Sequence, residues 1–140
     1  MIGSKSTTAL LLMSVLALGA CRGETLQNIN DAPFGVSATT APSPLTLSDY
    51  EKAIIRGGSR RNWIFEKVDD GHLVATNDVR GKHKAVVDVK FDTETVSITY
   101  KDSQNLNRDV DNNFIHPNYN HWVRNLLKDI RSEVQLAKAS

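Results

Sequence analysis

Two groups of basic residues carry the side chains in this sequence that are best suited to bind a ligand. The first group is Arg60 and Arg61. The second group follows further along the chain and consists of Arg80, Lys82, His83 and Lys84. A guanidinium group presents a planar fork of N–H donors, which matches a carboxylate in a bidentate arrangement. If the fold brings the two groups together, the sequence predicts a site for an anionic ligand.

The order of the predicted strands brings these groups together. In an antiparallel meander, the start of the first strand, the end of the second and the start of the third lie at the same end of the sheet. A polar loop that contains Asp102, Ser103 and Asn105 begins there too. We therefore expect one positive corner with Asn105 beside it. Two interpretations stay open: an internal network that ties the loop to the sheet, or a binding site for an anion.

The other reactive residue types form no recognisable site. His116 and His121 are five positions apart, which does not place them on one face of a helix. His72 and His83 lie beside turns, and no cysteine or carboxylate accompanies any histidine at metal-ligand spacing. No serine has the context of a G-x-S-x-G nucleophile. We expect no metal, no cofactor and no enzymatic activity.

The only cysteine of the chain, Cys21, follows a short apolar segment. Lys5 is the only ionisable side chain before it, and residues 9–18 are almost wholly apolar. This segment is about half as long as the roughly 20 residues that span a bilayer, so it is typical of a cleavable signal peptide. The cysteine ends the tetrapeptide Leu-Gly-Ala-Cys, which resembles the lipobox of bacterial lipoproteins. The resemblance implies cleavage after residue 20 and a diacylglyceryl group on the thiol of Cys21.

Lipid on Cys21 predicts a location. Each buried CH₂ contributes about 0.8 kcal/mol, and two or more acyl chains give stable attachment to a membrane. Residue 22 is arginine rather than the aspartate that retains many lipoproteins in the inner membrane. By this resemblance we expect the protein in the bacterial envelope, on the outer membrane and facing the periplasm. Without residues 1–20 the chain has equal numbers of basic and acidic residues, which gives no general attraction for nucleic acid.

The composition of residues 22–47 predicts a flexible tether. The segment is rich in small, polar and proline residues, which bury too little apolar surface to fold. A coil of about 25 residues reaches roughly 25–30 Å, so we expect the domain to stand off the membrane. The chain is thus predicted to contain a signal peptide (1–20), a lipidated cysteine with its tether (21–47) and one folded domain (48–140).

The folded domain is predicted to begin with a helix and to continue as four strands. Ser48 and Glu51 fit a capping box, and the helix is expected to end at Gly57 and Gly58. In the third and fourth strands, apolar and polar residues alternate, which is typical of half-buried antiparallel strands. The connections between the strands are short enough only for hairpins. The strands are expected over residues 63–68, 73–77, 84–91 and 95–101.

A second helix is predicted to follow the polar loop. Pro117 suits its first turn, and apolar residues recur at intervals of three and four along it. These are Tyr119, Trp122, Val123, Leu126, Leu127, Ile130 and Val134. Such a stripe is wide enough to cover a sheet face. We predict an α+β fold in the order α-β-β-β-β-α, with a single four-stranded antiparallel meander sheet and the N- and C-terminal helices on one face.

Three motifs stand out along the domain. They are Arg80-Gly81-Lys82-His83-Lys84-Ala85, Asp102-Ser103-Gln104-Asn105-Leu106 and Ile115-His116-Pro117-Asn118-Tyr119-Asn120, the last followed by Trp122-Val123. These motifs resemble a family of small, uncharacterised proteobacterial lipoproteins. The resemblance implies a lipid anchor and an envelope location. It implies no established activity, so it assigns no catalytic residue.

The sequence supports two functions from different classes. The first is a non-catalytic envelope lipoprotein that binds or scaffolds a protein partner through the uncovered sheet face or the positive corner. The alternative is a binding module for an anionic cell-wall component at the same corner. The lipidation site is Cys21. The candidate binding residues are Arg60, Arg61, Arg80, Lys82, His83 and Asn105.

Overall fold

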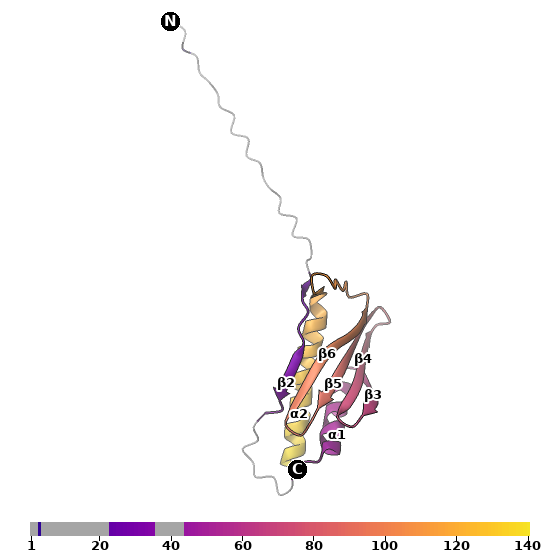
Figure 1. Ribbon diagram of the computed structural model, residues 1–140, viewed down its shortest axis with the longest axis vertical. Helices are drawn as coiled ribbons and strands as arrows, with labels where there is room; N and C mark the ends of the chain where they lie inside the picture. The colour runs from indigo at the N-terminus through magenta and orange to yellow at the C-terminus, as the bar shows by residue number, and fades with distance from the viewer. Residues whose placement is uncertain (1–2, 4–22, 36–43) are drawn as a thin grey trace.

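The structure, a computed structural model, describes residue 3 and residues 23–35 and 44–140 (Figure 1). The strands are β1 (Glu24–Thr25), β2 (Ile29–Pro33), β3 (Trp63–Asp69), β4 (His72–Val79), β5 (His83–Phe91), β6 (Thr95–Gln104) and β7 (Phe114–Ile115). The helices are α1 (Leu47–Ser59) and α2 (Pro117–Ala139). Neither of these helices is both long and apolar enough to cross a membrane. Cys21 and, apart from residue 3, the predicted signal peptide lie outside the described residues.

Five strands form one antiparallel sheet in the order β2-β6-β5-β4-β3. The α+β class and the predicted meander of four strands are confirmed as β3 to β6, but the sheet has a fifth strand. Val87 and Val89 of β5 are fully buried, whereas Val86 and Asp88 are only partly covered. Successive side chains of a strand point to opposite faces, so this alternation places one face of the sheet in the core.

The fifth strand corrects the prediction for the N-terminal segment. A flexible tether over residues 22–47 is wrong for residues 23–35. In this segment β2 pairs with β6, where Ile29 lies opposite Ile98, and β1 pairs with β7 in a small second sheet. Phe34, just beyond β2, is 2 % exposed. The segment carries no local strand signal because Asn, Asp and Pro are poor strand formers, and its partners lie far away in the sequence.

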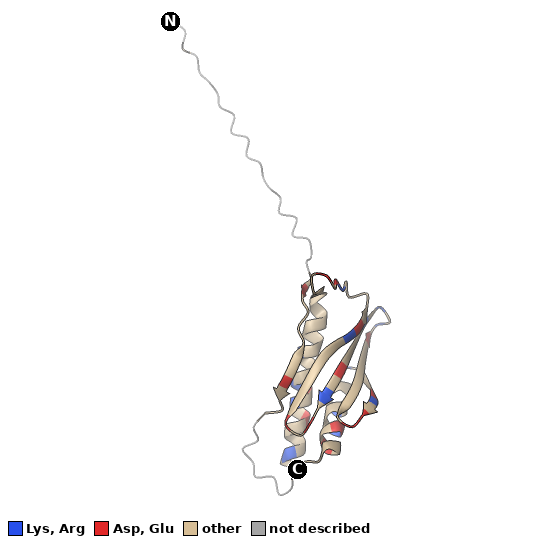
Figure 2. Cartoon of the chain, in the orientation of Figure 1, with Lys and Arg blue, Asp and Glu red and all other residues tan. Residues whose placement is uncertain are grey.

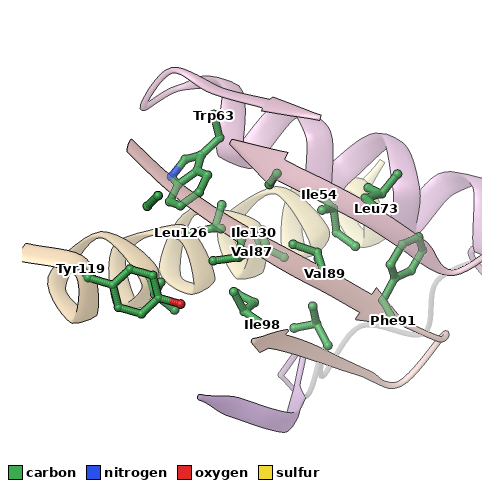
Figure 3. Close-up of a cluster of buried hydrophobic side chains, with 14 of the residues drawn as sticks. Ile54, Trp63, Leu73, Val87, Val89, Phe91, Ile98, Tyr119, Leu126 and Ile130 are labelled. Atoms are coloured by element: carbon green, nitrogen blue, oxygen red, sulfur yellow. The ribbon is translucent and has the colours of Figure 1, made fainter. Parts of the chain in front are cut away.

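Both helices lie behind the sheet in Figure 1 and cover its buried face. Their apolar side chains form one cluster with those of the strands (Figure 3). The cluster includes Ile54, Leu126, Ile130, Val87 and Val89. The helices also contact each other closely at Gly57, where an added Cβ would lie 2.8 Å from the Asp129 carbonyl oxygen. This contact brings the end of α1 against the second half of α2.

The start of α1 differs from the prediction. Its N-cap is Thr46 rather than Ser48. The Asp49 N–H donates to the Thr46 hydroxyl at 3.2 Å, and the Asp49 carboxylate accepts from the Thr46 N–H at 2.8 Å. This reciprocal pair is a capping box with aspartate in place of the predicted Glu51. The helix also ends later than predicted, at Ser59, because Gly57 and Gly58 are buried inside it rather than ending it.

The start of α2 agrees with the prediction. Pro117 occupies the first turn, where its missing N–H has no helical partner to lose. His116 is the N-cap, and its Nδ1 accepts from the Asn118 N–H at 3.1 Å. His116 therefore caps α2 with its side chain. The preceding residue, Ile115, is fully buried and fixes the end of the polar loop to the core.

Candidate functional site

A tight turn between β4 and β5 presents Arg80. The Lys82 N–H donates to the Val79 carbonyl oxygen at 3.1 Å, and φ is 59° at Arg80 and 66° at Gly81. These angles fit a type I′ turn, in which Asn-Gly is a preferred pair. A residue other than glycine held in this left-handed region costs of order 1–3 kcal/mol. An arginine kept at this cost, where asparagine fits better, points to a role for its side chain.

Two adjoining hollows meet at Arg80, between this turn and α2. Each has a volume of about 450 Å³. Both are lined by Val79, Arg80 and Trp122. The first extends toward the start of β3 and is also lined by Arg61, Asn62, Trp63, Asn77, Asp78, His121 and Asn125. The second extends toward the start of α2 and is also lined by Lys82, His83 and Asn118. We call the two hollows together the corner groove.

The wall of the first hollow contains a buried donor. Trp63 is 2 % exposed, and its Nε1 forms no hydrogen bond with any residue that the structure describes. Figure 3 shows Nε1 on the edge of the indole ring toward the Tyr119 end of α2, the part of the helix that carries His121 and Trp122. A buried donor without a partner costs about 1–3 kcal/mol.

The charges of the corner groove are partly balanced. Arg61 donates from Nε to Asp129 Oδ2 at 2.6 Å, so its charge is largely compensated. Asp78 adds one exposed carboxylate to the lining. Arg80 and Lys82, in contrast, are exposed and form no ion pair within residues 23–35 and 44–140. The net positive charge of the groove therefore comes from the turn between β4 and β5.

Arg60 lies apart from the groove. Its guanidinium forms an ion pair with Glu133 of α2, whose side chain is 9 % exposed, and it lines neither hollow. Of the predicted binding residues, the structure brings Arg61, Arg80, Lys82 and His83 to the groove. The two basic groups thus approach each other, as expected, but the first group is occupied by carboxylates of α2.

Asn105 ties the loop after β6 to the turn. Its side-chain amide donates to the Lys82 carbonyl oxygen at 2.6 Å, and its own carbonyl oxygen lies 2.9 Å from Nδ1 of His83. This is the internal network that was one of the two interpretations of the corner. The network fixes the backbone of the turn and does not involve the ammonium of Lys82 or the guanidinium of Arg80. It therefore holds the turn in place while these two charges stay exposed.

Sequence reasoning missed the α2 side of the groove. Asn118 and Trp122 are four positions apart, and so are His121 and Asn125. Residues at this spacing share a helix face. The signal was therefore present, as polar residues beside the apolar stripe. It could not be interpreted because only the packing of α2 on the sheet sets this face opposite the turn between β4 and β5.

One histidine–carboxylate contact lies outside the groove, on the uncovered sheet face. Nε2 of His72 is 2.7 Å from Oδ1 of Asp88, and Nζ of Lys101 is 3.7 Å from the same oxygen. In the part of the chain that the structure describes, no hydroxyl or thiol is hydrogen-bonded to this pair, and no three His, Cys, Asp or Glu residues could hold a metal ion. The contact joins neighbouring strands, as cross-strand pairs commonly do.

Comparisons with protein-family models, with curated proteins and with solved structures give no match for the chain. The corner groove and the N-terminal sequence are therefore the two features of the chain that indicate a function.

Proposed function

We propose that the protein is a lipid-anchored protein of the bacterial envelope that binds an anionic ligand in the corner groove without converting it. The lipid anchor is inferred from the apolar segment and the Leu-Gly-Ala-Cys sequence that ends at Cys21. The resemblance of three motifs to small proteobacterial lipoproteins supports the same location, on the outer membrane and facing the periplasm. The groove supplies the binding site.

The conformation of Arg80 carries the proposal. If the turn served only to connect two strands, asparagine at this position would form it with less strain. Arginine instead occupies the left-handed conformation, with φ of 59°, and its side chain lines both hollows without an ion pair among the described residues. A strained residue that presents an uncompensated charge to a cavity is typical of a binding site.

The groove suits a ligand with one acidic group and a polar body. A carboxylate or phosphate at Arg80 would accept two N–H donors at once, and Lys82 would add a second positive charge. The side-chain amide of Asn125, which lines the first hollow, is available to the uncharged part of the ligand. The half-buried Trp122, which lines both hollows, offers an apolar surface. A volume of about 450 Å³ lies within the usual range for small-molecule sites.

The variant Arg80→Asn tests the proposal because it removes the charge while favouring the turn. The acylated full chain in vesicles of phosphatidylcholine would be titrated with two soluble probes, and the changes followed by tryptophan fluorescence. A muropeptide supplies carboxylates, and glycerophosphoglycerol supplies a phosphodiester. We expect at least one probe to bind, and Arg80→Asn to weaken that binding at least tenfold.

Arg60→Ala is the matched control, because it removes an arginine charge close in sequence to Arg61 but outside the groove. We expect it to bind the probe like the natural chain. The proposal is refuted if neither probe binds, or if Arg80→Asn binds as tightly as the natural chain. A loss of the same size in Arg60→Ala would also refute it, because the effect would then be one of overall charge.

The anchor has its own test. Mass spectrometry of the mature protein, purified from bacterial membranes, should show a chain that begins at Cys21 and carries acyl groups on it. In Cys21→Ser, the thiol that accepts the lipid is absent, so the protein should leave the membrane fraction. A natural chain that still begins at Met1, or that carries no acyl group, would refute the lipid anchor without affecting the groove.

A second candidate function is binding of a protein partner by the uncovered sheet face. Ile64 and Val68, on the edge strand β3, are 73 % and 56 % exposed. Figure 2 shows basic and acidic residues interspersed on the strands, so an approaching surface of mixed charge would be accommodated. An edge strand also offers unpaired backbone groups. Crosslinking in cells should then capture one partner in stoichiometric amount, and Ile64→Lys should abolish the capture while Arg80→Asn leaves it unchanged.

A further inference from the structure

The lipidated cysteine precedes the folded domain by only two residues. Gly23 already contacts the domain, because an added Cβ there would lie 2.6 Å from the Ile115 carbonyl oxygen. β1 begins at the next residue and pairs with β7. Two residues of extended chain reach about 7 Å at most. In the sequence, only Arg22 separates Cys21 from this packed segment.

Several hydrogen bonds hold this first segment to the domain. Asn120 of α2 is 1 % exposed, and its side-chain amide donates to the Thr25 carbonyl oxygen at 2.9 Å and accepts from the Gln27 N–H at 3.0 Å. The Leu26 N–H donates to the Asn113 carbonyl oxygen at 2.8 Å. Residues 24–27 are thus fixed on both sides. The chain is therefore held on the domain from Gly23 onward, and a lipid on Cys21 would be attached two residues before this segment.

The second hollow of the corner groove lies at the same end of the molecule. Asn118, in the first turn of α2, lines it, and Lys82 and His83 line it from the opposite side. Figure 1 shows β1, the start of α2 and the turn between β4 and β5 at one end of the domain, with the C-terminus at the other end. An anchor at Cys21 would therefore bring the open part of the groove to the membrane surface.

We infer that the lipid on Cys21 holds this end of the domain directly on the bilayer, and that the anion bound by the groove is the phosphate of a lipid headgroup in the same leaflet. The inference rests on the proposed function, because it requires both the anchor and the binding site. It names the ligand: an anionic phospholipid. The groups that meet the phosphate are the guanidinium of Arg80 and the ammonium of Lys82.

The remaining charges at this end favour one bound headgroup over general attraction to anionic lipid. Glu24, Asp109 and Asp111 lie at the same end, and Figure 2 shows acidic residues along the loop there. Arg108 is already used, since its guanidinium donates to the carbonyl oxygens of Asp109 and Phe114. Arg80 and Lys82 thus bring positive charge without an ion pair among the described residues to the groove itself, and Lys84 lies beside them at the start of β5.

The orientation is tested with a label at each end of the acylated full chain. Val110 and Leu136 are both exposed, at 74 % and 57 %. Val110 lies in the loop beside β7, and Leu136 lies close to the far end of α2, roughly 28 Å along the helix from Pro117. With a fluorophore on Val110→Cys or Leu136→Cys, and vesicles that contain nitroxide-headgroup lipid, we expect strong quenching at position 110 and little at 136. Equal quenching at the two positions would overturn the orientation.

The ligand is tested in nanodiscs of equal parts phosphatidylglycerol and phosphatidylcholine. Native mass spectrometry of the released acylated protein should show at least a fivefold excess of retained phosphatidylglycerol. Arg80→Asn should remove the excess and keep the quenching at position 110, whereas Arg60→Ala should keep both. Equal retention of the two lipids by the natural chain would overturn the inference.

The soluble probes separate this inference from the proposed function. If the muropeptide binds and glycerophosphoglycerol does not, the groove binds an anion but the ligand is a cell-wall fragment, and the lipid assignment is wrong. If inorganic phosphate binds as tightly as glycerophosphoglycerol and nanodisc lipids are retained equally, the site is one for free phosphate, and the assignment is again wrong. If neither soluble probe is bound, the proposed function fails, and this inference, which rests on it, fails with it.

Discussion

The two groups of basic residues carry charge of the same sign but have different surroundings. Arg60 and Arg61 follow α1 and meet Glu133 and Asp129 of α2, so their charges join two helices. Arg80 and Lys82 belong to a turn that meets no carboxylate within 4.0 Å among the described residues. The role of a basic cluster can therefore be inferred only once the groups that its side chains contact are known. Cations that find carboxylates stabilise the fold, and cations that find none are available to a ligand.

The largest expected effect concerns the contact that brings the first group to α2. In Gly57→Ala, the new methyl group would lie 2.8–2.9 Å from backbone atoms of Asp129 and Ile130, so the helices must separate. We expect a loss of about 2 kcal/mol in the free energy of unfolding, because overpacking exceeds the gain in helix propensity. Urea unfolding measures it. Ser59→Ala, at the exposed end of the same helix, should change stability by less than about 0.5 kcal/mol.

A smaller loss is expected when the first group loses its partner. Arg60→Ala leaves the carboxylate of Glu133, 9 % exposed, without its cation, and should lower the free energy of unfolding by about 1 kcal/mol. Arg60 is itself half exposed, so solvent limits the effect. In Glu133→Gln the half-exposed guanidinium of Arg60 can be hydrated instead, so the free energy of unfolding should fall by less than in Arg60→Ala. A double-mutant cycle with additive effects would show that the pair does not contribute.

The second group should respond in the opposite direction. Arg80→Asn places asparagine at the left-handed position of the type I′ turn, next to Gly81, and should raise the free energy of unfolding by about 0.5 kcal/mol. The same variant should lose the ligand. If it is less stable than the natural chain by 1 kcal/mol or more, Arg80 supports the fold, and the contrast between the two groups disappears.

The smallest effect concerns the cap of α1, the helix that leads to the first group. Hydrogen bonds from the Thr46 backbone and hydroxyl hold the pKa of Asp49 below the usual 3.8. Because folding lowers this pKa, the ionised Asp49 side chain stabilises the fold fully above about pH 3.8. This stabilisation is lost as the pH falls from 3.8 through the pKa of Asp49 in the folded protein. The stability difference between the natural chain and Asp49→Asn should therefore be constant near neutral pH and shrink below pH 3.8. A difference independent of pH would show that the charge of Asp49 is not involved.

Local patterns were sufficient to predict most of the sheet and the second helix. Alternation in residues 84–91 and 95–101 reflects a sheet with one buried face, and the intervals of three and four after Pro117 reflect a helix on that face. The same reasoning failed for β2, because its pairing with β6 depends on residues far away and its own composition resembles a loop. It therefore predicted a long flexible tether where the structure has two strands.

The candidate site could be predicted only in part. The hairpin order correctly brought Arg61 and Arg80 to one hollow. It did not reveal that Arg60 turns to Glu133, or that Trp122 completes the groove, because both depend on how α2 is rotated against the sheet. That rotation is set by the packing of many side chains at once, which no short window of sequence contains.

The sequence by itself determined which residues alternate and which turns are tight, because these properties depend on neighbours along the chain, and it predicts a lipid on Cys21. The tertiary structure alone decided which arginines are paired and that the chain is already packed on the domain at Gly23. Hydrogen bonds and strand partners join residues up to about a hundred positions apart, such as the side chains of Asn120 and Glu24, which are hydrogen-bonded across 96 positions. Only the packed fold brings such residues close enough for their charges and hydrogen bonds to act on one another.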